Sequence, residues 1–488
     1  MVDERSGLPH RTGSRSADPG STGRLTSRLR RDLGTFESYA ALLGILIGAG
    51  IFRVTTEAWS LTGPSVILGY IVLAPAVLAT SVAYAVFLST SLGDEPGGEY
   101  THISRVFGHP GLAFVGTWLK VISYLGALAY LAIAFADYFI PLCRGHLQAG
   151  SRLPVALATL FFFYLVHIFG VRWFGRLQVV MFALLGASLV ILIGPGLAAI
   201  RVHHYRPFFT GGVAGFASCL PPLFFAYAGF ESLAQTAGEV KDSRRLLPRI
   251  FLRGTTATTA IFILISVVTF GVLPGSELAT STAPMSEVAA VYLPAAGTVV
   301  VTLGALMALA TSVNATMLVP SRLAIMLAQD RLAPRWMGAV SSRTGTPIIG
   351  LTATFLIAAL LLLSGQVALT LNIAVFALVI LYFLHSLALL VLPRANPALA
   401  AEVQVRIPRS WQRAAALFSL VTMGSLILLQ VIQDVQVLAH TTLAERLSFT
   451  SPGGLSLTSL ELALAWGLIG VVFYAIERFR IPRKGEAA

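Results

Sequence analysis

Charged residues are scarce in this chain. Only 11% of its 488 residues are charged, whereas a soluble domain typically carries about 25%. Apolar residues make up 56%, and apolar runs of about 20 residues recur from residue 36 to residue 480, each long enough to cross the ~30 Å core of a bilayer. These runs are continuous rather than alternating, which excludes a porin-like barrel. The sequence therefore predicts an all-α polytopic membrane protein.

Other absences narrow the class further. The two cysteines, Cys143 and Cys219, form no CxxC pair, so no disulfide framework is expected. A Walker A loop needs Gly before its lysine, and none of the three lysines follows a glycine: Lys120, Lys241 and Lys484. HExxH and a TVGYG-type filter are also absent. We therefore expect no enzyme activity, no cofactor and no metal site, and a carrier is the class that remains.

Turn and breaker residues divide the apolar sequence into segments. Residues 1–34 are rich in Arg, Ser and Gly, and predict a disordered cytoplasmic tail without a cleaved signal peptide. Residues 35–392 form the expected transport core, 393–480 a linker and the last two helices, and 481–488 a C-terminal tail. The twelve expected spans are 36–60, 63–91, 111–140, 153–170, 176–200, 213–237, 250–273, 288–314, 346–364, 368–392, 412–433 and 457–478.

Basic residues are distributed unevenly between the segments that join these spans. With a cytoplasmic N-terminus, 27 of the 34 Lys and Arg residues lie in cytoplasmic segments and 5 in outer ones, while Arg53 and Lys120 lie within spans. The bias remains 20 to 5 without the N-terminal tail. The positive-inside rule thus predicts cytoplasmic termini and an even number of spans. The net charge of +12 is an orientation signal, and no nucleic-acid partner is expected.

Two spans carry residues that interrupt helices. Span 1 contains Gly48-Ala49-Gly50, and span 6 contains Pro221-Pro222 followed by Gly229. Paired interruptions at matching positions are typical of secondary transporters built from repeats. Because the two breaks are five spans apart, the sequence predicts inverted halves of five spans each, with spans 11 and 12 appended. Gly44 and Gly48 also form a small-xxx-small motif, so helix packing is the alternative explanation for span 1.

The expected breaks suit a zwitterion. Unwound backbone at membrane depth is tolerated only where it lines a cavity. Helix N-terminal amides favour a carboxylate, and carbonyls at a C-terminal end favour an ammonium, so an α-amino acid is the obvious ligand. A cationic side chain has no evident partner except Glu231 or Glu57, which favours neutral amino acids. Arg53 either pairs with Glu57 at i+4 or attracts an anionic group.

The same residues resemble the amino acid–polyamine–organocation (APC) superfamily of transporters. Similar motifs follow in order over roughly residues 36–392: GAGIF at Gly48–Phe52, PGGEY at Pro96–Tyr100, FAYAGFE at Phe225–Glu231, the stretch through Glu239 and Pro248, and RLAIMLAQDRLAP at Arg322–Pro334 before RTGTP. The last of these resembles the loop after span 8. The resemblance implies the leucine-transporter-type 5+5 inverted repeat and alternating access.

The resemblance also implies a binding site. The substrate carboxylate would meet span 1 near Ala49 and Gly50, the amine would meet carbonyls of Phe225–Ala228, and Phe230 would be a lid. The side-chain pocket would draw on spans 1, 3, 6, 8 and 10. The expected substrate-binding residues are Ile47, Gly48, Ala49, Gly50, Ile51, Phe225, Ala226, Tyr227, Ala228, Gly229 and Phe230.

Coupling is the point at which the chain departs from the family pattern. Several proton-driven or sodium-independent members carry a lysine in span 5, but here Leu185 or Gly186 stands near that place. Coupling to protons or to a counter-transported amino acid stays open. Glu231 and Lys120 are the candidates for coupling or gating. The alternatives are a helix-packing contact for Glu231 and snorkelling of Lys120 to the cytoplasmic interface.

These observations predict a secondary transporter that moves amino acids across the plasma membrane. The alternative is a non-transporting amino acid sensor or assembly subunit built on the same fold.

Overall fold

The computed structural model describes residue 26 and residues 29–50, 54–143, 149–278, 281, 284–365, 367–447 and 457–479. Within this part of the chain the structure is helical, apart from a single bridge between Leu33 and Val240. Eight helices are long and apolar enough to cross a membrane: α3 (Val66–Leu88), α5 (Pro110–Leu142), α7 (Val171–Ala198), α10 (Ser243–Val272), α13 (Ala295–Gln329), α15 (Val367–Ala395), α17 (Arg409–His440) and α19 (Ser459–Phe479).

Four shorter helices are also apolar: α1 (Thr35–Ala49), α6 (Arg152–Ile168), α8 (Gly212–Ala226) and α14 (Ile348–Leu363). Each of the twelve expected spans coincides with one of these helices, so the prediction of a polytopic helical membrane protein is confirmed. The short α-helices between them are α2 (Thr55–Thr62), α4 (Glu99–Phe107), α9 (Ser232–Gln235), α11 (Gly275–Leu278), α12 (Pro284–Tyr292), α16 (Pro397–Ala401) and α18 (Leu443–Leu447). The 3₁₀ turns are η4 (Gly63–Ser65), η5 (Ser91–Asp94), η6 (Ala149–Ser151), η7 (Val202–Tyr205), η8 (Ala237–Glu239) and η9 (Arg335–Gly338).

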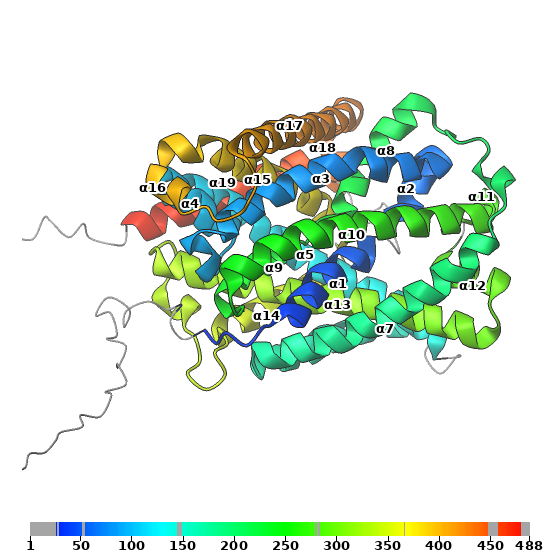
Figure 1. The fold of residues 1–488 in the computed structure, drawn as a ribbon, viewed down its shortest axis with the longest axis horizontal. Helices are drawn as coiled ribbons and strands as arrows, with labels where there is room; N and C mark the ends of the chain where they lie inside the picture. Colours follow the sequence, from blue (N-terminus) through cyan, green and yellow to red (C-terminus); the bar gives the residue numbers. More distant parts are fainter. Residues whose placement is uncertain are drawn as a thin grey trace, which may run out of the picture.

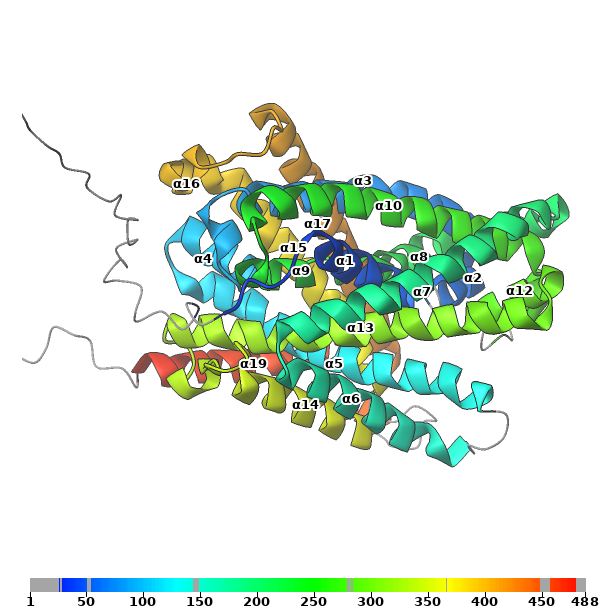
Figure 2. The same cartoon turned by 60° about the horizontal axis from the view of Figure 1, so that its bottom comes forward.

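Helices from the two expected halves pack in matched pairs. The second span packs on the seventh (α3 on α10), the third on the eighth (α5 on α13), and the fourth on the ninth (α6 on α14). Partners five spans apart are what two equivalent halves produce. The first helix, α1, lies in the middle between α10 and α13 (Figure 2). Every partner of α1 is therefore another helix, which suits a segment whose backbone is interrupted.

The last two long helices lie outside this core. Helix α17 packs against α15 and α3 along one edge of the bundle (Figure 1), and α19 packs against α15 and α5. Their outward faces carry exposed apolar side chains, such as Val421 on α17 and Leu464 on α19. Such faces suit contact with lipid, because lipid tails impose no cost on exposed apolar side chains.

Two helical segments differ from the expected spans. Span 8 was expected to end at residue 314, and Arg322–Pro334 to form a loop, but α13 continues to Gln329. Hydropathy falls at Arg322, yet the helix continues because Arg322 is only 1% exposed and pairs with a buried carboxylate. Helix α4 was not expected, since its nine residues are too short and too polar to read as a span.

The end of the expected N-terminal tail, residues 1–34, packs against the bundle at Leu33. Leu33 is fully buried; its N–H donates to the carbonyl of Glu239 (3.0 Å), and its carbonyl accepts from the N–H of Lys241 (2.9 Å). Residues 1–25, 27–28 and 480–488 lie outside the described residues. The segment leading into α1 and the end of α19 lie at the same end of the bundle, with α4 and α16 (Figures 1 and 2). The described chain therefore crosses the bundle an even number of times.

Candidate functional site

Helix α1 is interrupted inside its expected span. Gly48 has non-helical angles (φ −39°, ψ −122°), which kink the helix near its end at Ala49. Two hydroxyls on α13 bond carbonyls one turn earlier: Thr311 Oγ1 donates to the Gly44 carbonyl (2.9 Å), and Ser312 Oγ donates to the Ile45 carbonyl (3.2 Å). Neighbouring Ser and Thr side chains thus supply the partners that a broken membrane helix requires.

Glycines in this break permit close packing. A Cβ on Gly50 would lie 2.6 Å from the carbonyl oxygen of Ala226, which is backbone and cannot rotate away. A Cβ on Gly48 would lie 1.6 Å from Ser312 Oγ, and one on Gly44 would lie 2.9 Å from Thr311 Cβ. The helix-packing explanation therefore holds for Gly44 and Gly48, while Gly50 brings the first break against the second.

The second break follows α8. The helix ends at Ala226, a turn occupies residues 227–231, and α9 begins at Ser232. Gly229 has φ +110°, a backbone conformation that residues with a side chain rarely adopt. The N–H of Ser232 donates to the Gly229 carbonyl (2.9 Å), which closes the turn. Pro221 and Pro222, expected to belong to this interruption, lie inside α8 and do not end it. The interruption is at residues 227–231, and the first break contacts its start at Ala226.

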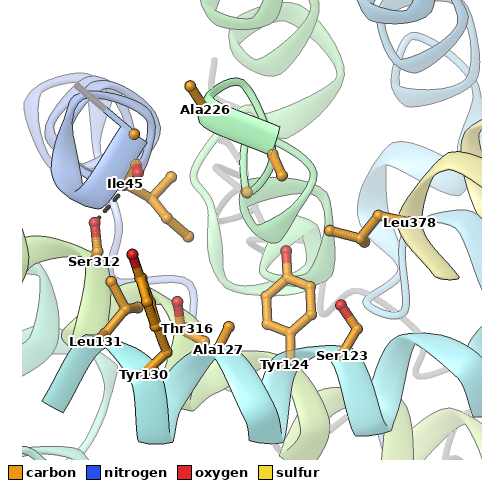
Figure 3. A pocket seen from close by; sticks show the side chains of 13 residues that line it. Ile45, Ser123, Tyr124, Ala127, Tyr130, Leu131, Ala226, Ser312, Thr316 and Leu378 are labelled. Carbon is orange, nitrogen blue, oxygen red and sulfur yellow. Dashed lines mark hydrogen bonds between the residues drawn. The ribbon is translucent and has the colours of Figure 1, made fainter. Parts of the chain in front are cut away.

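A cavity lies between the two breaks (Figure 3). It measures about 50 Å³, which is room for only a few water molecules by the usual ~10–15 Å³ each. Its lining comes from α1, α5, the α8–α9 break, α13 and α15, which are spans 1, 3, 6, 8 and 10. The lining residues are Ile45, Gly50, Ser123, Tyr124, Ala127, Tyr130, Leu131, Ala226, Ala228, Gly229, Ser312, Thr316 and Leu378. None of them carries a charge.

Sequence-predicted residues divide into those at the cavity and those away from it. Gly50, Ala226, Ala228 and Gly229 line it. Gly48 is next to it and contacts Ser312, which does line it. Several predicted residues fall outside the described part of the chain: the side chains of Ala49, Phe225 and Glu57, and all of Ile51 and Arg53. The Arg53–Glu57 pair therefore stays a prediction.

Three predicted residues point their side chains elsewhere. Ile47 is fully buried and lines a separate apolar groove beside α7. Tyr227 packs its ring against Tyr70, with ring centroids 5.9 Å apart. Phe230, the expected lid, is fully buried and stacks on Tyr382 at 5.4 Å rather than lining the cavity. In a turn, consecutive side chains point in different directions, and the sequence motif does not show which of them faces the cavity.

The sequence analysis expected span 3, which is α5, at the pocket, but it did not name the residues of α5 that line it. Figure 3 shows Ser123, Tyr124 and Ala127 on α5 beside the end of α8. With Tyr130 and Leu131 these positions recur at the spacing of one helical face. That spacing was a usable signal, because small and hydroxyl residues form a stripe within an otherwise apolar span.

Glu231 lies directly behind the cavity wall and is fully buried. Its carboxylate accepts from the hydroxyl of Tyr124 (2.5 Å), from the hydroxyl of Tyr382, and from the N–H of Gly229 (2.9 Å). Tyr124 and Gly229 both line the cavity, so this carboxylate is connected to the site through two of its walls. Among the described residues no cation pairs with it.

Lys120 is buried and does not snorkel. Its ammonium donates to Glu99 Oε2 at 2.8 Å, and both side chains are 1% exposed. Glu99 also accepts from Gln235 Nε2 (2.7 Å) and from the hydroxyl of Tyr84. The pair joins α4, α5 and α9 beneath the second break. The snorkelling alternative is therefore wrong, because the ammonium has a carboxylate partner inside the bundle.

Ion pairs tie the end of the bundle that carries α4. The carboxylate of Glu239 accepts two bonds from the Arg322 guanidinium, at 3.1 and 3.0 Å, with both side chains almost fully buried. At the same end, Arg105 pairs with Asp330 (3.0 Å), and Asp94 pairs with both Arg31 and Arg244. In the part of the chain with described coordinates, no group of three His, Cys, Asp or Glu residues is arranged to hold a metal ion.

Residues 33–444 match the family described as amino acid permease, which is most of the chain. The chain belongs to this family. The expected kinship with APC transporters is confirmed, and the protein is a multi-pass membrane protein of that kind.

Curated relatives of this family member are permeases and transporters. The branched-chain amino acid permease BcaP of Bacillus subtilis is 27% identical over 347 residues, covering 66% of this chain and 72% of the relative. The methylthioribose transporter of the same species is 26% identical over 396 residues, covering 77% and 84%. The chloroplastic cationic amino acid transporter 9 of Arabidopsis thaliana is 28% identical over 326 residues, covering 63% and 56%.

Proposed function

We propose that this permease is a secondary transporter that moves an amino acid across the plasma membrane by alternating access. The single observation that carries the proposal is the cavity enclosed by two contacting helix breaks. Interrupted helices at a repeat interface present amides and carbonyls to a substrate. Membership of the amino acid permease family supports the same conclusion.

The cavity of about 50 Å³ must widen to admit an amino acid, and the two breaks then take opposite ends of the substrate. The carboxylate lies against the α1 break near Ala49 and Gly50, beside the kink at Gly48. The ammonium lies against carbonyls of Phe225–Ala228 at the end of α8. The dipoles of the two half-helices favour this orientation over the reverse, because amides bind anions and carbonyls bind cations.

The substrate's side chain is neutral and small. Ala127, Leu131 and Leu378 make part of the lining apolar, and no described lining residue offers a charge to a charged side chain. An uncompensated charge in such a site would be costly. A branched-chain amino acid permease is among the relatives, which supports aliphatic substrates. A cationic amino acid transporter is also among them, so the pocket rather than the family carries this choice.

Alternating access requires the two ends of the bundle to open in turn. The end with α4 is tied by Glu239–Arg322, Arg105–Asp330 and the Asp94 pairs. We assign this end to the cytoplasm, because the segments expected to be cytoplasmic carry the excess of basic residues and both described chain ends lie there (Figures 1 and 2). Release of substrate inward then requires these ion pairs to separate.

Purified protein in liposomes tests the proposal. The vesicles are loaded with one unlabelled amino acid, and entry of labelled alanine, leucine, lysine, glutamate and methylthioribose is compared. We expect exchange of alanine or leucine and little of lysine or glutamate. No exchange of any amino acid by well-folded protein would contradict the proposal. Exchange confined to lysine would contradict the neutral pocket but leave the transporter in place.

A further inference from the structure

The structure places a second buried carboxylate, Glu231, one side chain away from the buried Lys120–Glu99 pair. Lys120 pairs with Glu99 at 2.8 Å, and its ammonium also lies 5.2 Å from the ring centre of Tyr124. The hydroxyl of that same Tyr124 donates to Glu231 at 2.5 Å. Glu99, Lys120 and Glu231 therefore form one buried group, which we call the triad.

When both carboxylates are ionised and Lys120 is protonated, the triad has a net charge of one negative unit. Its three side chains are at most 1% exposed, so water does not screen this excess. An isolated charge at such a place is expensive, and intramembrane ionisable groups of this kind mark ion or proton pathways. The second buried pair, Glu239–Arg322, has one charge of each sign and no such excess.

No neighbouring described group supplies the missing positive charge. Burial and the Lys120 ammonium lower the pKa of His102 to about 3, so this α4 histidine is neutral at physiological pH. His102 Nδ1 shares a hydrogen bond with His385 Nε2 (2.9 Å), and His385 bonds no carboxylate. The titratable side chains that face the triad from α3, α4, α5 and α15 are Tyr84, His102, Tyr124, Tyr382 and His385.

Glu99 itself is disposed to take up a proton. It begins α4, outside the membrane-spanning helices. Burial raises the pKa of the Glu99 carboxyl, Lys120 opposes the rise, and Glu231 adds to it. Because the folded-state pKa is raised, protonation of Glu99 begins at a higher pH than in water.

We propose that the triad of Glu99, Lys120 and Glu231 is the proton site of a proton-coupled cycle, binding one proton with each substrate. This inference rests on the proposed transport function. A proton from the outer solution forms an O–H bond on one carboxylate, which makes the triad neutral. The same bond breaks when the site opens to the cytoplasm, and the proton leaves there with the substrate.

The coupling to substrate runs through the cavity wall. Tyr124 and Gly229 both line the cavity and both donate to Glu231. Protonation of the triad changes how strongly Glu231 holds these two donors, and thereby changes the shape that the substrate meets. The cavity wall then has one arrangement when the triad is protonated and another when it is not. Proton and substrate favour each other's binding, because both bind more tightly to the same arrangement.

Wild-type protein in liposomes gives the first test. Counterflow of a neutral amino acid is measured in vesicles that hold a pH indicator in the lumen. We expect substrate entry to acidify the lumen, and an inward proton gradient to increase accumulation several-fold. Working counterflow without proton entry would overturn the triad proposal while leaving the transporter intact. Absence of counterflow would overturn the proposed function instead.

Substitutions then locate the site. Glu99→Gln leaves one carboxylate, Glu231, with the one ammonium of Lys120 and so removes the excess negative charge. We therefore expect counterflow to persist while proton entry and gradient-driven accumulation are lost. Lys120→Met removes the ammonium, so we expect the pH dependence of accumulation to move to higher pH. Unchanged proton entry in Glu99→Gln, or no upward move in Lys120→Met, would overturn the proposal.

Glu239→Gln is the matched control, because it breaks a buried ion pair of balanced charge. We expect this variant to keep the wild-type number of protons per substrate wherever it keeps counterflow. Loss of proton entry in Glu239→Gln as well as in Glu99→Gln would show that the effect does not belong to the triad, and would overturn the proposal.

Discussion

At Gly50 two interrupted helices come into backbone contact. The missing side chain of this glycine is what allows the α1 break to approach the carbonyl of Ala226. A backbone oxygen cannot move aside as a flexible side chain can, so any substituent must separate the breaks. If the proposed site is correct, we expect affinity for the substrate to depend on this position more than on the other glycines in span 1.

Gly50→Ala tests this contact. Its Cβ would lie 2.6 Å from the Ala226 oxygen, and overpacking of this kind costs about 1–3 kcal/mol, which is roughly a 5- to 150-fold loss of substrate affinity. Equilibrium binding of a labelled neutral amino acid is the measurement. Gly186→Ala on α7 is the matched control, because a Cβ there meets nothing within 4 Å. Equal affinities in the two variants would contradict the account.

Among the elements, α5 supplies the longest wall of the cavity. Five of its positions line the site, and Ala127 is the smallest of them. Because the cavity is narrow, the volume of this side chain limits which substrates fit beside Leu131 and Leu378.

We expect substitutions of Ala127 to change the selectivity in opposite directions. Ala127→Val should lower exchange of leucine more than that of alanine, and Ala127→Gly should do the reverse, each by roughly 10-fold, because one methylene in an apolar pocket is worth about 1–3 kcal/mol. The ratio of leucine to alanine exchange is the readout. A ratio that moves the same way in both variants would show that Ala127 does not face the substrate's side chain.

The buried pair between η8 and α13 gives a prediction about stability. Removing one partner leaves an uncompensated buried charge, which costs about 3–5 kcal/mol, whereas replacing both with apolar residues is often nearly neutral. Arg322→Met should therefore lower the thermal unfolding midpoint in detergent more than Glu239→Leu/Arg322→Met does. A double variant at least as unstable as the single one would contradict a role for this ion pair in closing the bundle.

Local and long-range features differ in how far the sequence reveals them. Hydropathy is local, so the apolar helices and both glycine breaks were predicted within a few residues. The extension of α13 past Arg322 was not, because it depends on Glu239, 83 residues earlier. The Glu99–Lys120 pair was missed for the same reason, since neither residue shows its partner in the sequence. The side-chain directions of Tyr227 and Phe230 depend on the turn around Gly229, which a motif does not specify.

At the scale of the whole molecule, both described chain ends lie at one end of the bundle (Figures 1 and 2). The proposed assignment of that end to the cytoplasm predicts that Cys143, which follows α5, lies on the outer side of the membrane. In intact cells a membrane-impermeant thiol reagent should label wild-type protein and not Cys143→Ala, because Cys219 is buried. If Cys143 were labelled only in permeabilised cells, it would lie on the cytoplasmic side and the proposed orientation would be wrong.

Counterflow tests the central claim most directly. Liposomes loaded with unlabelled leucine or alanine are diluted into a trace of the labelled amino acid, for wild-type protein and for Gly50→Leu. The account predicts transient accumulation of label by wild-type protein above the level outside, and none by a Gly50→Leu protein that remains folded. Accumulation by Gly50→Leu at the wild-type rate would contradict a substrate site between the two helix breaks.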